Sequence, residues 1–95
     1  MHAMYIYWTG IEMKDEEIKL RIIRKLHIRG CWGTHHTSES NLQKGFPSHL
    51  RGKILDLAEE LRKEGLLVKH PTHHEAQWNL NWDKKLEIEK MLGIG

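Results

Sequence analysis

Residues 47–80 read PSHLRGKILDLAEELRKEGLLVKHPTHHEAQWNL, and this stretch decides the fold. Its first half predicts an amphipathic helix, because apolar residues recur at spacings of three and four and so share one stripe of a helix. Ser48, beside Pro47, is expected to cap the start of this helix, and Gly65 is expected to end it. The apolar stripe consists of Leu50, Ile54, Leu57, Ala58 and Leu61.

After Gly65 the apolar period changes from about 3.6 to about 2, which predicts two short strands. The first strand contains residues 66–68, and the second contains Ala76, Trp78 and Leu80. The Pro-Thr-His-His segment between them is typical of a turn. A helix, a glycine stop and a β-hairpin therefore follow one another.

The bulk composition is that of one small soluble domain. The chain has 95 residues, of which 39% are hydrophobic and 29% charged, so it can build one modest core under a heavily charged surface. Its single cysteine, Cys31, has no intramolecular disulfide partner. No apolar run approaches the about 18 residues of a membrane span, and the N-terminus lacks signal-peptide features. We therefore expect a cytoplasmic protein that does not bind a membrane.

Upstream of this stretch, residues 1–13 are an apolar, aromatic lead-in, and residues 14–95 form the single domain. Residues 14–29 predict a second amphipathic helix that Gly30 ends. Its outward basic residues are interpreted as a solvated face, with a supporting role in phosphate contact as the alternative. The predicted inward residues are Ile18, Ile22, Ile23 and Leu26, and the predicted outward ones are Lys19, Arg21, Arg24 and Lys25.

Residues 31–36, CWGTHH, are too short for a helix and are expected to pair as an edge strand of about three residues. Thr37 or Ser38 then caps a brief helix that runs to about Lys44, with Leu42 facing inward and Gly45 ending it. The tight connection from Gly45 to Pro47 joins this helix to the next one, which makes a helix-turn-helix.

The C-terminal residues predict a last helix, residues 82–92, with Asn81 as its N-cap and Gly93 as its stop. We expect this helix to cover the core, and a homodimer formed through it is the alternative. Its predicted apolar face consists of Leu86, Ile88, Met91 and Leu92.

Charge is unevenly distributed, although the formal net charge is only +2. Residues 40–55 contain no carboxylate, and neither do residues 65–74, whereas both stretches carry basic residues and histidines. The sequence therefore predicts one positive side, built from the front of the main helix and the turn of the hairpin. Short runs without acids also arise by chance, and that interpretation stays open.

The order of helix, short strand, helix, turn, helix, hairpin and helix resembles the winged helix-turn-helix family over residues 14–92. Residues 61–67, LRKEGLL, resemble that family's exit from the recognition helix into the first wing strand. Residues 42–52, LQKGFPSHLRG, together with Pro71-Thr72, are similar to small archaeal winged-helix proteins. The resemblance implies an α+β fold with a three-helix core, a short strand plus a two-stranded wing hairpin, and a C-terminal helix.

The same resemblance implies a small transcription regulator that binds double-stranded DNA. Winged helices also bind RNA or proteins. The alternative is therefore docking on RNA, the ribosome or a protein partner without DNA binding, through Trp32, Trp78, Trp82 and the aromatic N-terminus.

In a DNA-binding member, the helix from Ser48 would enter the major groove with its first residues nearest the bases. Arg51 is the candidate for base reading, because its planar fork fits guanine O6 and N7 together. Lys44 and Lys53 suit phosphates. The full set implied for DNA binding is Lys44, Ser48, His49, Arg51, Lys53, Lys69, His73 and His74.

Gly52 and the composition of the wing both bear on the predicted DNA binding. Gly52 costs the helix about 1 kcal/mol relative to alanine, which close approach of a ligand or a crowded contact with the short helix would explain. The wing has one lysine and no arginine. Its histidines become cationic near pH 6, so DNA affinity is expected to rise as the pH falls from about 7.5 to about 6.

Metal binding and catalysis are not expected. Among the eight histidines and one cysteine, only Cys31 and His35, four residues apart, approximate a pair of zinc ligands. The sequence has no glycine-rich phosphate loop and no Gly-x-Ser-x-Gly motif. We therefore predict a binding protein without a cofactor or an enzymatic activity.

Overall fold

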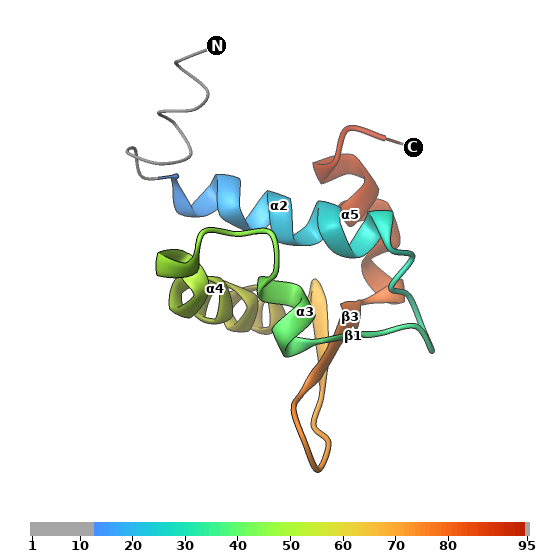
Figure 1. Cartoon of the computed structure of the whole chain (residues 1–95). Coiled ribbons are helices and arrows are strands. Elements are labelled where there is room, and N and C mark those ends of the chain that lie inside the picture. Colours follow the sequence, from blue (N-terminus) through green and yellow to red (C-terminus); the bar gives the residue numbers. More distant parts are fainter. Residues whose placement is uncertain (1–12, 95) are drawn as a thin grey trace.

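Helices and a small antiparallel sheet share one hydrophobic core in the computed structural model, which describes residues 13–94 (Figure 1). This arrangement confirms the predicted α+β class. In chain order the elements are α2 (Asp15–Ile28), β1 (Thr37–Ser38), α3 (Glu39–Gln43), the 3₁₀ turn η1 (Ser48–Leu50), α4 (Arg51–Lys63), β2 (Leu67–His70), β3 (Gln77–Leu80), the 3₁₀ turn η2 (Trp82–Lys84) and α5 (Lys85–Met91).

The two long helices form as their apolar periodicity predicts. The four predicted inward residues of α2 are fully buried, and so are four of the five stripe residues of α4, with Leu50 packed at the margin of the core. Gly30 and Gly65 follow the two helices with φ values of 65° and 83°, a conformation that favours glycine. The predicted lead-in lies outside the described residues apart from Met13, which is buried.

The start of α4 differs from its prediction. Ser48 does not cap the helix, because the chain enters it through η1, where the backbone N–H of Leu50 donates to the carbonyl of Pro47 at 2.9 Å. The backbone therefore satisfies a donor that a side-chain cap would otherwise take.

The sheet has the strand order β1-β3-β2, so β3 lies in the centre. The hairpin strands β2 and β3 pair antiparallel from Leu67 opposite Leu80 to His70 opposite Gln77, which confirms both predicted strands. In Figure 1 the turn of this hairpin projects away from the helices. Trp78 on β3 is fully buried, and its Nε1–H donates to the Glu39 carboxylate at 3.1 Å.

The strand predicted within residues 31–36 is wrong. Only an isolated bridge between Trp32 and Leu80 forms there, because Gly33 turns the chain with a φ of 58°. The strand β1 comes later, with Thr37 opposite Trp78. Ser38 then caps α3 as predicted, since its Oγ accepts from the N–H of Asn41 at 3.2 Å.

Lys19 was predicted to point outward, and this is wrong, because the residue is only 8% exposed. Its Nζ lies 3.0 Å from a carboxylate oxygen of Glu60 and 3.1 Å from one of Glu64, so it joins α2 to α4. Hydrogen bonds to these two carboxylates raise the pKa of the Lys19 amine above its ordinary value.

The C-terminal segment begins as predicted, because the Asn81 side-chain oxygen accepts from the N–H of Asp83 at 3.1 Å. Its helix α5 is shorter than expected, and only Ile88 of the predicted face is fully buried. Leu86 is 81% exposed and Met91 43% exposed, contrary to prediction. Leu86 and Ile88 are about 200° apart on a helix, so they cannot face the same core. None of the helices within residues 13–94 is both long enough and apolar enough to cross a membrane.

Candidate nucleic-acid interface

The front of α4 presents part of the predicted DNA-binding set to solvent. Ser48, His49 and Arg51 are all exposed. Within residues 13–94 the Arg51 guanidinium forms no ion pair. Its five donors are therefore available to a ligand that approaches this end of the helix.

Gly52 stands in this exposed first turn of α4. A Cβ added to it would meet no atom within 4 Å, so the explanation by crowding against the short helix is wrong. Its φ is not positive, so the backbone does not require glycine either. The helix backbone is therefore open to close approach from outside.

Lys53 is less available than the sequence indicated. Its Nζ lies 3.0 Å from Oδ1 of Asp15, so the side chain joins the first turns of α4 and α2. Both side chains are about half exposed, which makes this a screened surface pair.

Carboxylates occupy the later turns of α4. Glu59 accepts at 2.7 Å from Nε of Arg62 and at 2.7 Å from Nζ of Lys69. Hydrogen bonds from Lys69 and Arg62 hold the pKa of the Glu59 carboxyl below its usual range. The hairpin's one lysine is therefore bound to a carboxylate of the neighbouring helix.

This cluster predicts an acid-sensitive contribution to stability. Because the folded protein lowers the Glu59 pKa below 4.5, the paired carboxylate stabilises the fold above that pH, and this stabilisation is lost as the pH falls through the lower, folded value. In Glu59→Gln we expect a smaller loss of unfolding free energy between about pH 6 and about pH 3. Urea titrations across that range measure it, with Glu87→Gln on α5 as the matched control. Equal pH dependence in the two variants would contradict the prediction.

The turn of the hairpin exposes His73 and His74. The Oγ1 of Thr72 accepts from the His74 N–H at 3.2 Å and donates to the carbonyl of Glu75 at 2.5 Å, which orders the turn. The Glu75 carboxylate in turn accepts from the N–H and hydroxyl of Ser40, at 2.7 and 2.5 Å. These bonds lower the pKa of Glu75 and place a negative charge between the hairpin turn and α3.

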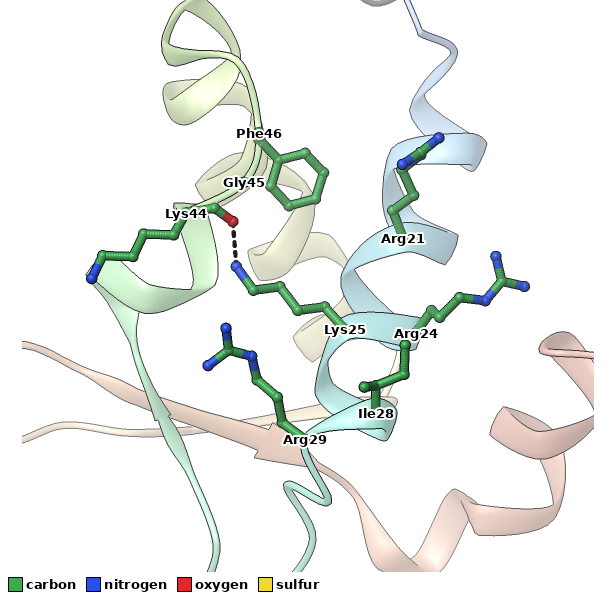
Figure 2. Close-up of a pocket in the computed structure, with 8 residues that line it drawn as sticks. All are labelled: Arg21, Arg24, Lys25, Ile28, Arg29, Lys44, Gly45 and Phe46. Atoms are coloured by element: carbon green, nitrogen blue, oxygen red, sulfur yellow. Dashed lines mark hydrogen bonds between the residues drawn. The ribbon is translucent and has the colours of Figure 1, made fainter.

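A second concentration of positive charge lies elsewhere, in a hollow of about 490 Å³ between α2 and residues 44–46 (Figure 2). We call it the basic hollow. The spacing of three and four that brings its α2 residues together is visible in the sequence, which favours a solvated face with a supporting role in phosphate contact as the alternative. The residues lining it are Arg21, Arg24, Lys25, Ile28, Arg29, Lys44, Gly45 and Phe46.

Lys25 closes the inner side of the basic hollow. Its Nζ donates to the backbone carbonyls of Asn41, Leu42 and Lys44, the Leu42 bond measuring 3.1 Å. Figure 2 shows the bond to the Lys44 carbonyl. The Asn41 carbonyl also accepts from the backbone N–H of Lys44 at 3.2 Å, so the ammonium adds to the backbone capping at the C-terminal end of α3. Burial, followed by the charges of Arg29 and Lys44, lowers the pKa of Lys25.

No family model, curated protein or solved structure matches this chain.

The two weak metal-ligand candidates lie in different surroundings. Cys31 is buried at 3% exposure, and burial raises the pKa of its thiol. His35 is exposed. Within residues 13–94 no three His, Cys, Asp or Glu side chains are grouped as metal ligands would be.

The tryptophans predicted for docking differ in their exposure to solvent. Trp78 is fully buried in the core, so its predicted role in docking is wrong. Trp82 is 59% exposed and meets Trp32 edge to face, with ring centroids 5.4 Å apart. Of the tryptophans within residues 13–94, Trp82 and the partly buried Trp32 are therefore the ones a partner can reach.

Proposed function

We propose that this protein is a winged helix that binds double-stranded DNA as a small transcription regulator, with the first turn of α4 in the major groove. The observation that carries the proposal is the exposed front of α4, where Arg51 has no ion-pair partner within residues 13–94 and Gly52 leaves the backbone open. The succession of α2, β1, α3, α4 and the β2–β3 hairpin supports the family assignment.

The charges of α4 favour a docking geometry in which the helix enters the groove by its front end. Arg51 and Lys53 lie in its first turn, whereas Asp56 and Glu59 follow one and two turns later. A carboxylate close to the phosphate backbone is repelled, so the later turns are expected to lie away from it. Lys44 precedes the helix and suits a flanking phosphate.

Duplex binding at several salt concentrations, with NMR mapping at low salt, tests the proposal. Three to five phosphate contacts predict that log K falls with log salt at a slope of about −2.7 to −4.5. The mapped shifts should be confined to residues 44–55 and to the hairpin turn. An absence of shifts, or stronger ones with a structured RNA, would contradict DNA binding.

Gly52→Ala is expected to have opposite effects on the stability of the fold and on the affinity for DNA. We expect the variant to be more stable by about 1 kcal/mol, because alanine is the better helix former and its methyl group meets open space. The same methyl group should obstruct close approach of DNA and weaken duplex binding about fivefold, equivalent to about 1 kcal/mol. Urea denaturation and a duplex titration measure the two effects. A more stable variant with unchanged affinity would place Gly52 outside the interface.

Protein docking, including pairing of two copies through α5, is a second candidate function. Large apolar side chains stay exposed near the end of α2 and along the C-terminal segment. Sedimentation of the parent and of Leu86→Glu tests the pairing, since a monomeric parent at high concentration would contradict it. The exposed residues are Ile28, Trp82, Leu86, Met91 and Ile94.

A further inference from the structure

We infer that the basic hollow is a binding site for a phosphate group, carried either by a small phosphorylated ligand or by a nucleic-acid backbone. Apart from Lys44, its residues are distinct from the front of α4. Phosphate binding in the basic hollow can therefore be tested separately from the proposed major-groove contact.

The wall of the basic hollow has one sign of charge. Five of its eight lining residues are basic and none is acidic. Arg21, Arg24, Lys25 and Ile28 share one face of α2 because they are spaced by three and four residues. Lys44 and Phe46 come from a segment far along the chain and form the opposite wall. A concave surface lined by one sign of charge focuses its field on an ion of opposite sign.

Several cations outside the basic hollow are paired with carboxylates, although within residues 13–94 Arg51 is not. Lys19 binds Glu60 and Glu64, and Lys69 binds Glu59. By contrast, Arg24 and Arg29 form no ion pair within residues 13–94. Like charges at such short spacings repel one another, so an anion bound among them would remove an unfavourable interaction.

Lys25 lies among like charges inside the hollow. Burial is the main cause that lowers its pKa, and the neighbouring cations Arg29 and Lys44 lower it further. Its ammonium is held by three backbone carbonyls, so its position is fixed. Figure 2 shows the Arg29 guanidinium on the same side of α2 as this ammonium, whereas Arg21 and Arg24 extend outward from the helix.

The chemistry of the lining fits a phosphate with a group attached. Arginine presents a planar fork that binds phosphate oxygens in pairs, and Lys44 adds a flexible point charge. Ile28 and the ring of Phe46 supply apolar surface beside these cations. The volume of about 490 Å³ falls within the range of small-molecule sites. There is therefore room for more than the phosphate itself.

The test titrates the full chain with sodium phosphate, with adenosine monophosphate and with a short DNA duplex. Sodium chloride at matched ionic strength is the reference, and NMR shifts and the melting temperature are the readouts. We expect phosphate to shift the amides of residues 24–29 and 44–46 saturably and to raise the melting temperature more than chloride does. Equal effects of the two salts would overturn the inference.

A double variant, Arg24→Gln with Arg29→Gln, should weaken phosphate binding at least about tenfold, since it removes two cations from the hollow. A control, Lys63→Gln with Lys90→Gln, removes two exposed cations outside the hollow and should bind phosphate as the parent does. Equal weakening in both double variants would show a general charge effect and would overturn the site.

The two sources of the phosphate are distinguished by the other probes. Tighter binding of adenosine monophosphate than of phosphate supports a small phosphorylated ligand. Saturation of the hollow by the duplex, abolished in the Arg24/Arg29 variant, supports a nucleic-acid backbone. If phosphate binds here while the duplex binds nowhere, the inference stands and the proposed DNA-binding function fails.

Discussion

Replacing Trp78 by alanine is expected to lower the free energy of unfolding by about 3–5 kcal/mol, the cost of removing a large aromatic side chain from a core. Trp78 is fully buried on the central strand β3 and lies opposite Thr37 on β1 and Lys69 on β2. Its indole also binds Glu39 at the start of α3. Since a domain of this kind is stable by about 5–15 kcal/mol, the substitution removes a large part of the total.

Urea denaturation followed by far-ultraviolet circular dichroism measures this loss. Trp82→Ala is the matched control, because Trp82 is 59% exposed and should cost only about 1 kcal/mol. Trp78→Phe keeps a ring but lacks the N–H donor, and so separates packing from the hydrogen bond to Glu39. Equal transition midpoints for the two alanine variants would contradict the role of Trp78 in the core.

Arg51→Ala is expected to weaken binding to a preferred duplex by about 1–3 kcal/mol and to reduce the discrimination between DNA sequences. The exposed guanidinium at the front of α4 has no ion pair within residues 13–94 that would compete with DNA. Lys53→Ala should have a smaller effect, alike for every sequence, because Lys53 is shared with Asp15 and suits only phosphates.

Competition binding with a panel of duplexes, at one fixed salt concentration, measures both variants. Lys90→Ala removes an exposed charge on α5 and serves as the control for net charge. Identical sequence profiles for Arg51→Ala and Lys53→Ala would contradict the division between base reading and phosphate contact. A loss in Lys90→Ala as large as that in Arg51→Ala would contradict a localised interface.

Much of the fold could be predicted because it depends on local periodicity. The buried stripes of α2 and α4, the glycine ends and the two hairpin strands all follow from the spacing of apolar residues. Lys19 could not be predicted, because its burial depends on Glu60 and Glu64, which are far along the chain. The short strand was misplaced for a similar reason, since β1 is defined by its pairing with β3.

The candidate site was predictable only where it is contiguous in sequence. The exposed front of α4 corresponds to the run without acids, residues 40–55. The fold brings Asp15 to Lys53 at this surface, and it brings Glu75 to Ser40 between the hairpin turn and α3. The basic hollow was not predicted, because its two walls are separated by the whole of β1 and α3.

The position of β2 has a practical consequence for handling the protein. Within residues 13–94, β2 forms an outer edge of the sheet, so part of its backbone is available for pairing with another chain. Edge strands resist such aggregation when they carry a lysine or adjoin a proline, and here Lys69 lies within the edge and Pro71 directly follows it. A Lys69 variant made to examine DNA contact should therefore be followed by light scattering as well, because it also removes a charge that keeps these molecules apart.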